Sequence, residues 1–289
     1  MIVMASTRGP FTGDDFEEIR NHDLIQLGIA ADERLRAQRG QRVTYVRVQE
    51  VSSSMIPADV EVLPGAGELR IAIDPETQDE ALILTRSVAS VSGNVPLTGF
   101  RLDQLAEVCN NEGRTLGRLL TDLRKAGLQM VSALSAETVL ARKWLEVSSD
   151  VGVDVARLTI ERSEADGGVD LLRKISGWGT STRHVHTFAP LAGRMDEAVT
   201  TGYGDMRTIA LARLLVDNID SIQVDWSRLG AKLAQVALTF GADDIDSVSP
   251  SDSLEHGPRR RPLEELKRNI LAADRVPVER DGCFEMSTL

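Results

Sequence analysis

Cysteine is scarce in this chain of 289 residues, with only Cys109 and Cys283 present. The two lie far apart and form neither a CxxC pair nor any other spacing typical of a metal site. A secreted domain stapled by disulfides is therefore not expected. We expect a chain of the reducing cytoplasm.

Other absences narrow the class further. The start of the chain shows no basic segment followed by an apolar one, and no run of about 18 apolar residues occurs, so we predict neither a signal peptide nor a transmembrane helix. The net charge of −11 argues against nucleic acid or an anionic membrane as a partner, because both require a positive field. A local basic pocket could still bind an anionic small molecule.

Short β-branched runs alternate along the chain with longer amphipathic segments. Residues 1–13 are expected to be disordered, and residues 14–289 to form one domain that begins with a helix and ends with a helix and an extended tail. The expected strands are Val43–Val51, Leu69–Asp74, Val95–Phe100, Leu128–Leu134, Val155–Glu161, Val185–Pro190, Ile222–Trp226 and Asp244–Val248.

Strands that alternate with helices of 10–15 residues indicate βαβ units and a parallel sheet. About eight strands fit an α/β fold of the (β/α) TIM-type barrel class. We expect the barrel to be incomplete or to have a remodelled first βα unit. A doubly wound open sheet is the alternative, although no GxGxxG or P-loop supports a nucleotide-binding version of it.

The last third of the chain resembles a known family. The stretch Asp205–Val248, with ALTFGADDID at Ala237–Asp246, resembles aminofutalosine synthase and the related deazaflavin-cofactor synthases. The segments HTFAPLAG and AADRVPVERD, at His186–Gly193 and Ala272–Asp281, follow in the order of that family. The resemblance implies a radical-SAM barrel and a link to menaquinone biosynthesis by the futalosine route.

The same resemblance implies a CxxxCxxC motif after the first strand, whose three thiolates hold a [4Fe–4S] cluster that binds SAM. No cysteine occurs before Cys109, and the space between residues 51 and 68 is too short for both a cluster loop and a helix. The expected glycine-rich turns are replaced by Ala72–Pro75 and Ser132–Ser135. We therefore expect no cofactor, and doubt that SAM binds.

Candidate site residues lie where the expected strands end, because barrel chemistry is found at the carboxyl ends of the strands. Glu161 and Asp225 are the catalytic candidates, since a positioned carboxylate can act as a general base. The ligand-binding candidates are Arg101, Ser132, Ser135, Arg162, Gln223 and Ser227. The resemblance implies that the strand with Gln223, Asp225 and Ser227 lines the substrate cavity, and a buried structural network is the alternative.

No metal site is predicted. His184 and His186 form an HxH pattern on one strand face, but a transition-metal site needs three or four converging ligands.

Two functions follow from these observations. The first is a pseudoenzyme, or an accessory or ligand-binding homologue, of the futalosine route. Such a protein could pair with a second copy or an active paralogue, because loss of the first helix should leave a flank of the sheet uncovered. The second is a repurposed enzyme that uses acid–base groups at the strand ends on a small anionic or nucleoside-like substrate.

Overall fold

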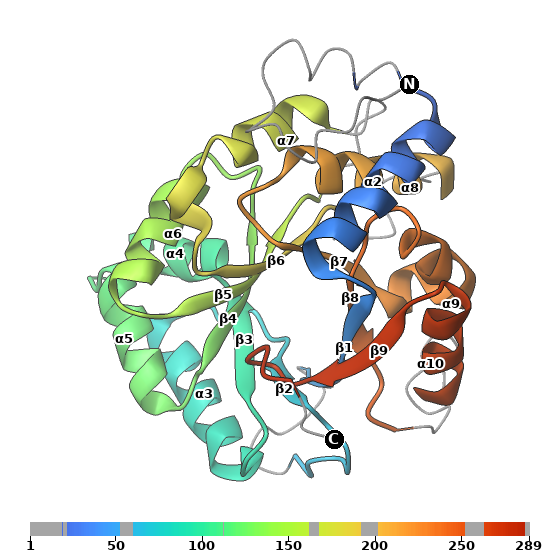
Figure 1. Cartoon of the computed structure of the whole chain (residues 1–289). Helices are drawn as coiled ribbons and strands as arrows, with labels where there is room; N and C mark the ends of the chain where they lie inside the picture. The colour runs from blue at the N-terminus through green and yellow to red at the C-terminus, as the bar shows by residue number, and fades with distance from the viewer. Residues whose placement is uncertain are drawn as a thin grey trace.

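A computed structural model describes residues 19, 22–52, 60–111, 113–161, 168–191, 202–251 and 263–286. Its centre is a closed ring of eight parallel strands, surrounded by helices (Figure 1). The predicted barrel class is confirmed, and both the open sheet and an incomplete barrel are wrong. The expected disorder of residues 1–13 concerns residues outside those described.

The strands of the ring are connected in order around the barrel. They are β1 (Arg42–Val51), β2 (Glu68–Ile71), β3 (Leu97–Arg101), β4 (Met130–Ser135), β5 (Asp154–Thr159), β6 (Val185–Ala189), β7 (Ser221–Asp225) and β8 (Asp244–Val248). Strand β8 pairs in parallel with β1, which in turn pairs with β2, so the ring has no free edge.

Helices follow the strands from β2 onward and form the outer layer. They are α3 (Gln78–Ser92), α4 (Leu102–Asn111), α5 (Leu116–Ala126), α6 (Ala141–Asp150), α7 (Val169–Ser176), α8 (Gly202–Leu215), α9 (Trp226–Ala237) and α10 (Leu263–Ala272). A short 3₁₀ helix, η2 (Gly179–Thr182), precedes β6, and α2 (Leu24–Arg39) precedes β1 and packs on α8. None of these helices is both long and apolar enough to cross a membrane.

Side-chain caps explain where several helices begin. The Thr77 and Thr115 side chains accept hydrogen bonds from the backbone N–H groups of Glu80 and Arg118, which starts α3 and α5. Each cap satisfies a backbone donor that the first helical turn would otherwise leave unpaired.

The first βα unit is remodelled, as expected, but it does not expose the sheet. In the described residues 60–67 no helix covers β1 and β2. The loop is fastened by Gln49, which donates to the carbonyl of Glu61 and accepts from the N–H of Leu63, both at 2.8 Å. The outward-facing Leu69 and Ile71 are buried, so the expected uncovered flank is wrong.

A ninth strand pairs with the part of β1 that the short strand β2 does not reach. Strand β2 pairs only with residues Val48–Val51 of β1. Strand β9 (Val276–Arg280) pairs in parallel with the first half of β1, from Arg42 to Val46. The expected extended tail is therefore a strand, and it completes the barrel wall at the amino-terminal end of the strands.

Candidate functional site

Arg101 and Glu161 meet at the carboxyl ends of the strands. Arg101 ends β3, and its guanidinium forms an ion pair with Glu161, just beyond β5, and another with Asp103 at 2.9 Å. Burial alone would lower the pKa of Arg101, but Asp103 and Glu161 outweigh it and raise the pKa. The structure thus brings one catalytic and one ligand-binding candidate together, as partners of each other.

This ion pair should contribute little to folding, because the Glu161 side chain is 41% exposed. We expect Glu161→Gln to lower the free energy of unfolding by less than about 1 kcal/mol, as is usual for pairs in contact with water. Urea denaturation of parent and variant measures the difference. A loss of several kcal/mol would show that the pair is a structural clamp and not a group at the mouth of the barrel.

Asp225 ends β7 and caps α9. One carboxylate oxygen accepts hydrogen bonds from the N–H of Arg228 at 3.0 Å and from the hydroxyl of Ser227 at 2.6 Å. The other accepts from the hydroxyl of Ser247 at 3.1 Å. Asp225 and Ser227 therefore lie together, but the predicted shared strand face is wrong, because Ser227 lies in the first turn of α9. Both carboxylate oxygens of Asp225 are engaged in local structure.

The remaining candidates are dispersed. Gln223 is buried and donates to Asp244 at 2.7 Å. Ser132 is also buried, and its hydroxyl donates to the carbonyl of Phe100. The hydroxyl oxygen of Ser135 accepts a weak bond from the N–H of Glu137 at 3.4 Å. Arg162 lies outside the described residues.

Sequence reasoning missed a network of charges inside the barrel. Asp246 on β8 pairs with Arg70 on β2 at 2.8 Å and with Arg157 on β5. Only the interior can bring these three non-adjacent strands into contact. Burial would raise the pKa of Asp246, but Arg70 and Arg157 outweigh burial and hold it well below the ordinary range. Glu68, also on β2, completes the network through Arg70 at 2.7 Å.

A second buried acid, Asp244, lies two residues earlier on the same strand. It binds Arg280 of β9 through both oxygens, at 2.6 and 2.8 Å, and accepts from the hydroxyl of Thr44. Asp243, next to it, forms an ion pair with Arg213 of α8 at 2.5 Å. Each of the three acids of the ADDID segment is thus paired with an arginine from a different element of the fold.

A closed ring of parallel strands with an outer layer of helices defines the class of protein: an α/β barrel of the TIM type. Solved structures share this fold. Methylornithine synthase is similar with a TM-score of 0.64 over 93% of this chain and 95% of that one, at 16% identity. HydG, a maturase of the [FeFe]-hydrogenase, has a TM-score of 0.62 over 95% of this chain and 74% of its own, at 13% identity.

The sequence is similar to particular members of that class. Residues 188–255 match the family described as the CofH/MqnC C-terminal region. A 5-amino-6-(D-ribitylamino)uracil–L-tyrosine 4-hydroxyphenyl transferase of Methanothermobacter thermautotrophicus is 27% identical over 92% of this chain and 90% of its own length. Aminodeoxyfutalosine synthase of Thermus thermophilus is 29% identical over 57% of this chain and 54% of its own. The chain is therefore similar in sequence to aminofutalosine synthase and the CofH-like transferases of the radical-SAM superfamily.

The alignment with the Methanothermobacter transferase also bears on the loss inferred between β1 and β2. It spans 337 positions, which is more than the 289 residues of this chain. The relative therefore carries segments that this chain lacks, although the alignment length does not locate them.

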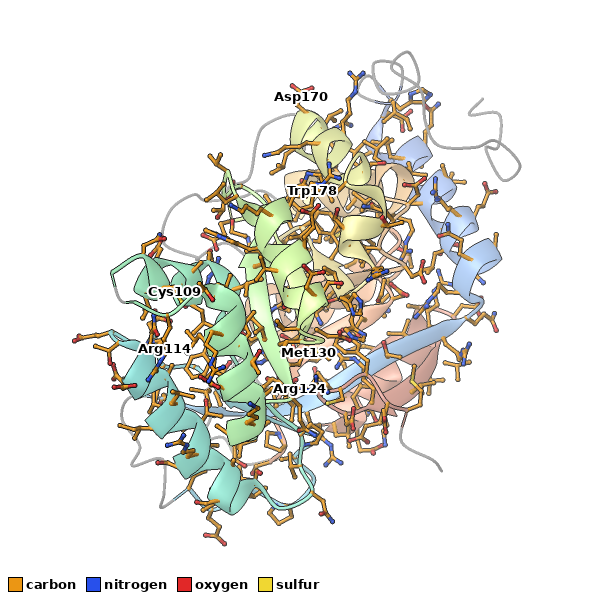
Figure 2. All side chains as sticks on the ribbon, turned by 90° about the vertical axis from the view of Figure 1, so that its left-hand side faces the viewer. Cys109, Arg114, Arg124, Met130, Asp170 and Trp178 are labelled. Carbon is orange, nitrogen blue, oxygen red and sulfur yellow. The ribbon has the colours of Figure 1, made fainter. Side chains whose placement is uncertain are left out.

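The expectation of no cofactor is overturned by these relatives. They are radical-SAM enzymes, which use a [4Fe–4S] cluster and SAM, and cysteines missing from one loop do not outweigh that relationship. The two thiols of this chain nevertheless do not fit a three-thiolate site. Cys109 lies in α4 of the outer layer (Figure 2), and burial and nearby acids raise the pKa of Cys283 to about 11. No reaction step of this chain is therefore assigned to a cluster.

Proposed function

We propose that this protein is a ligand-binding homologue of the aminofutalosine synthase and CofH-like group, which takes a family-type small molecule at the carboxyl ends of its strands and does not carry out its relatives' reaction. The observation that supports this proposal is the engagement of both catalytic candidates. Glu161 is held by Arg101, and Asp225 caps α9.

The same contacts weigh against a repurposed acid–base enzyme. A general base needs a carboxylate oxygen directed at the substrate's proton. Both oxygens of Asp225 accept hydrogen bonds from the protein itself. Arg101, in contrast, is 28% exposed and can present part of its guanidinium to an anionic ligand.

Calorimetric titration tests the proposal with three probes: a chorismate-derived enol ether, 5-amino-6-(D-ribitylamino)uracil and L-tyrosine. We expect at least one to bind saturably without turnover by chromatography. We expect Arg101→Gln to weaken that binding at least tenfold. Arg114→Gln is the matched control, because Arg114 lies on the outer layer, where it pairs with the exposed Asp79 (Figure 2).

Two results would contradict the proposal. Turnover of a probe would make the protein a catalyst, and failure of all three to bind would remove the ligand-binding role. A homodimer, or a complex with an active paralogue, belongs to the same proposal and is tested by light scattering on a sizing column.

A further inference from the structure

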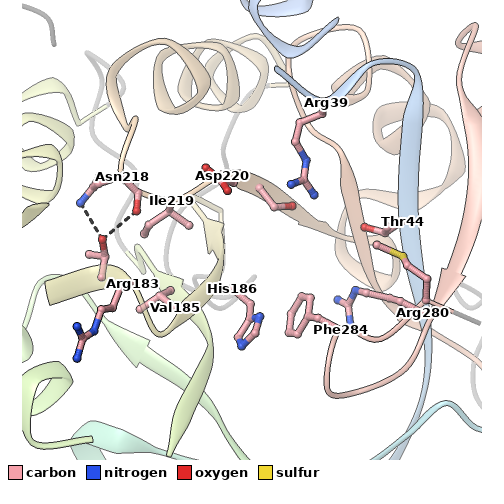
Figure 3. Close-up of a pocket in the computed structure, with 13 residues that line it drawn as sticks. Arg39, Thr44, Arg183, Val185, His186, Asn218, Ile219, Asp220, Arg280 and Phe284 are labelled. Carbon is pink, nitrogen blue, oxygen red and sulfur yellow. Dashed lines mark hydrogen bonds between the residues drawn. The ribbon is translucent and has the colours of Figure 1, made fainter. Parts of the chain in front are cut away.

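A cavity of about 340 Å³ opens at the amino-terminal end of the barrel, opposite the strand ends considered above (Figure 3). Its wall comes from the starts of β1, β6 and β7 and from the segment after β9. Pockets that bind small molecules have volumes of about 300–1,000 Å³. The cavity is thus large enough for a compact metabolite.

One side of the cavity is formed by stacked rings. Phe284 lies parallel to His186, with the ring centroids 4.5 Å apart, and the guanidinium carbon of Arg280 lies 3.8 Å from the Phe284 centroid on its ring face. The Nε2 atom of His186 is 2.8 Å from Asp154, and the Nδ1 atom of His184 is 2.7 Å from the other oxygen of that carboxylate. The hydrogen bond from His186 is the largest cause that lowers the pKa of Asp154, although burial opposes it. His186 and Arg280 are therefore already paired with Asp154 and Asp244, while Arg183, which also lines the cavity, donates to the hydroxyl of Ser149.

The other side carries a cation and an anion that are not paired with each other. Arg39, at the end of α2, uses its Nε atom for Asp243 at 3.2 Å, and its two Nη groups have no partner among the described residues. The carboxylate of Asp220 is exposed and has no partner in the same part of the chain. In Figure 3 both side chains lie along the rim of the cavity across from His186 and Phe284.

Both charges lie near the same two groups, Asp243 and Arg213. One carboxylate oxygen of Asp243 accepts a hydrogen bond from Arg39, and the other accepts one from the hydroxyl of Ser221. Ser221 directly follows Asp220 in the chain. Both charges also act on Arg213, since Arg39 lowers its pKa and Asp220 raises it, although burial is the largest cause of its shift. The apolar side chains of Val185 and Ile219 also line the cavity.

We propose that this cavity binds a small zwitterion, an α-amino acid with an apolar side chain. The guanidinium fork of Arg39 would receive the carboxylate, since arginine matches the planar geometry of that group. Asp220 would receive the ammonium group, and the apolar side chain would lie against Ile219 and the edge of Phe284. A simple anion matches Arg39 alone and leaves its own charge beside Asp220, which disfavours it.

Calorimetric titration of the full chain with L-leucine and L-methionine tests the proposal. We expect saturable binding at one site, with 4-methylpentanoate and 3-methylbutylamine, which lack the ammonium and the carboxylate of leucine, at least tenfold weaker. Arg39→Gln and Asp220→Asn should each weaken amino-acid binding at least tenfold. Arg42→Gln and Asp217→Asn are matched controls, since both residues are exposed nearby but do not line the cavity.

Asp220→Asn is the more informative variant, because the carboxylate of Asp220 has no hydrogen bond or ion pair among the described residues that its loss would break. Its charge acts on the neighbouring Arg213 through space alone. The proposal is overturned if neither amino acid binds, if 4-methylpentanoate binds as tightly as leucine, or if Asp220→Asn binds like the parent protein. A probe that responds to Arg101→Gln and not to Asp220→Asn would belong to the opposite end of the barrel.

Discussion

Asp246→Asn should lower the free energy of unfolding by about 3–5 kcal/mol, the cost expected when one partner of a buried ion pair is removed. The Asp246 side chain is 1% exposed and is shared by Arg70 and Arg157. The amide keeps the shape but leaves two guanidinium groups in the barrel interior with one countercharge, Glu68, in contact with Arg70. Chemical denaturation monitored by circular dichroism measures the loss.

The matched control is Asp217→Asn, an exposed change on the loop after α8, which should cost less than about 0.5 kcal/mol. The pH dependence gives a second check. Because the folded pKa of Asp246 is depressed, its stabilisation is complete above the unfolded value of about 3.9 and is lost as the pH falls below it. The gap between parent and variant should stay constant from pH 7 to about pH 5 and narrow below about pH 4. An equal stability at pH 7 would mean that the network does not hold the barrel together.

Deletion of residues 276–289 should abolish cooperative unfolding. It removes β9, which leaves the first half of β1 without a neighbour on that side, and it removes Arg280 from the fully buried Asp244. An unpaired strand edge and an uncompensated buried charge are both strongly unfavourable. We expect a broad thermal transition by calorimetry and strong binding of a hydrophobic dye, as in loosely packed compact states.

The control for this deletion removes only residues 287–289 and should melt like the parent. If the longer deletion also melted cooperatively at the temperature of the parent, β9 would be an addition to a barrel that is stable without it. Arg280→Gln would then separate the two effects, since it keeps the strand and removes only the charge.

The pattern of the sequence predicted the barrel well because the signal is local and repeated. Each predicted strand is a short, largely apolar run, and from Leu69 onward each is followed by a helical period. Strand β9 was missed for the opposite reason. VPVER has no turn that joins it to a neighbour, and its partner on β1 lies more than 200 residues earlier.

The charges inside the barrel carried a signal that could have been used. Arg70 and Arg157 each stand within a predicted strand, and Asp244 and Asp246 share one face of another because side chains alternate along a strand. Charged residues in strands of a closed barrel must find partners across its interior. Sequence alone gave no means to pair them, and the candidates at the strand ends were chosen instead.

The structure brings only some of those candidates together. Arg101 contacts Glu161 because both lie at the carboxyl ends of barrel strands. Asp225 contacts Ser227 because the two residues lie in the same turn at the start of α9. Ser132 and Gln223 instead donate hydrogen bonds to acceptors on adjacent strands, the carbonyl of Phe100 and the carboxylate of Asp244. The sequence pattern predicts which residues lie at the strand ends, but it does not predict which hydrogen-bond partner each side chain has.

The pairing of β1 with β9 has a consequence for synthesis on the ribosome. Residues 42–46 emerge early but cannot find this neighbour until residues 276–280 have left the exit tunnel. Since chains emerge at about 5–20 residues per second, this edge of β1 waits for roughly ten seconds or more. During that interval the nascent chain presents an open strand edge, the kind of surface that chaperones shield, and the wall of the barrel is completed only when translation is nearly over.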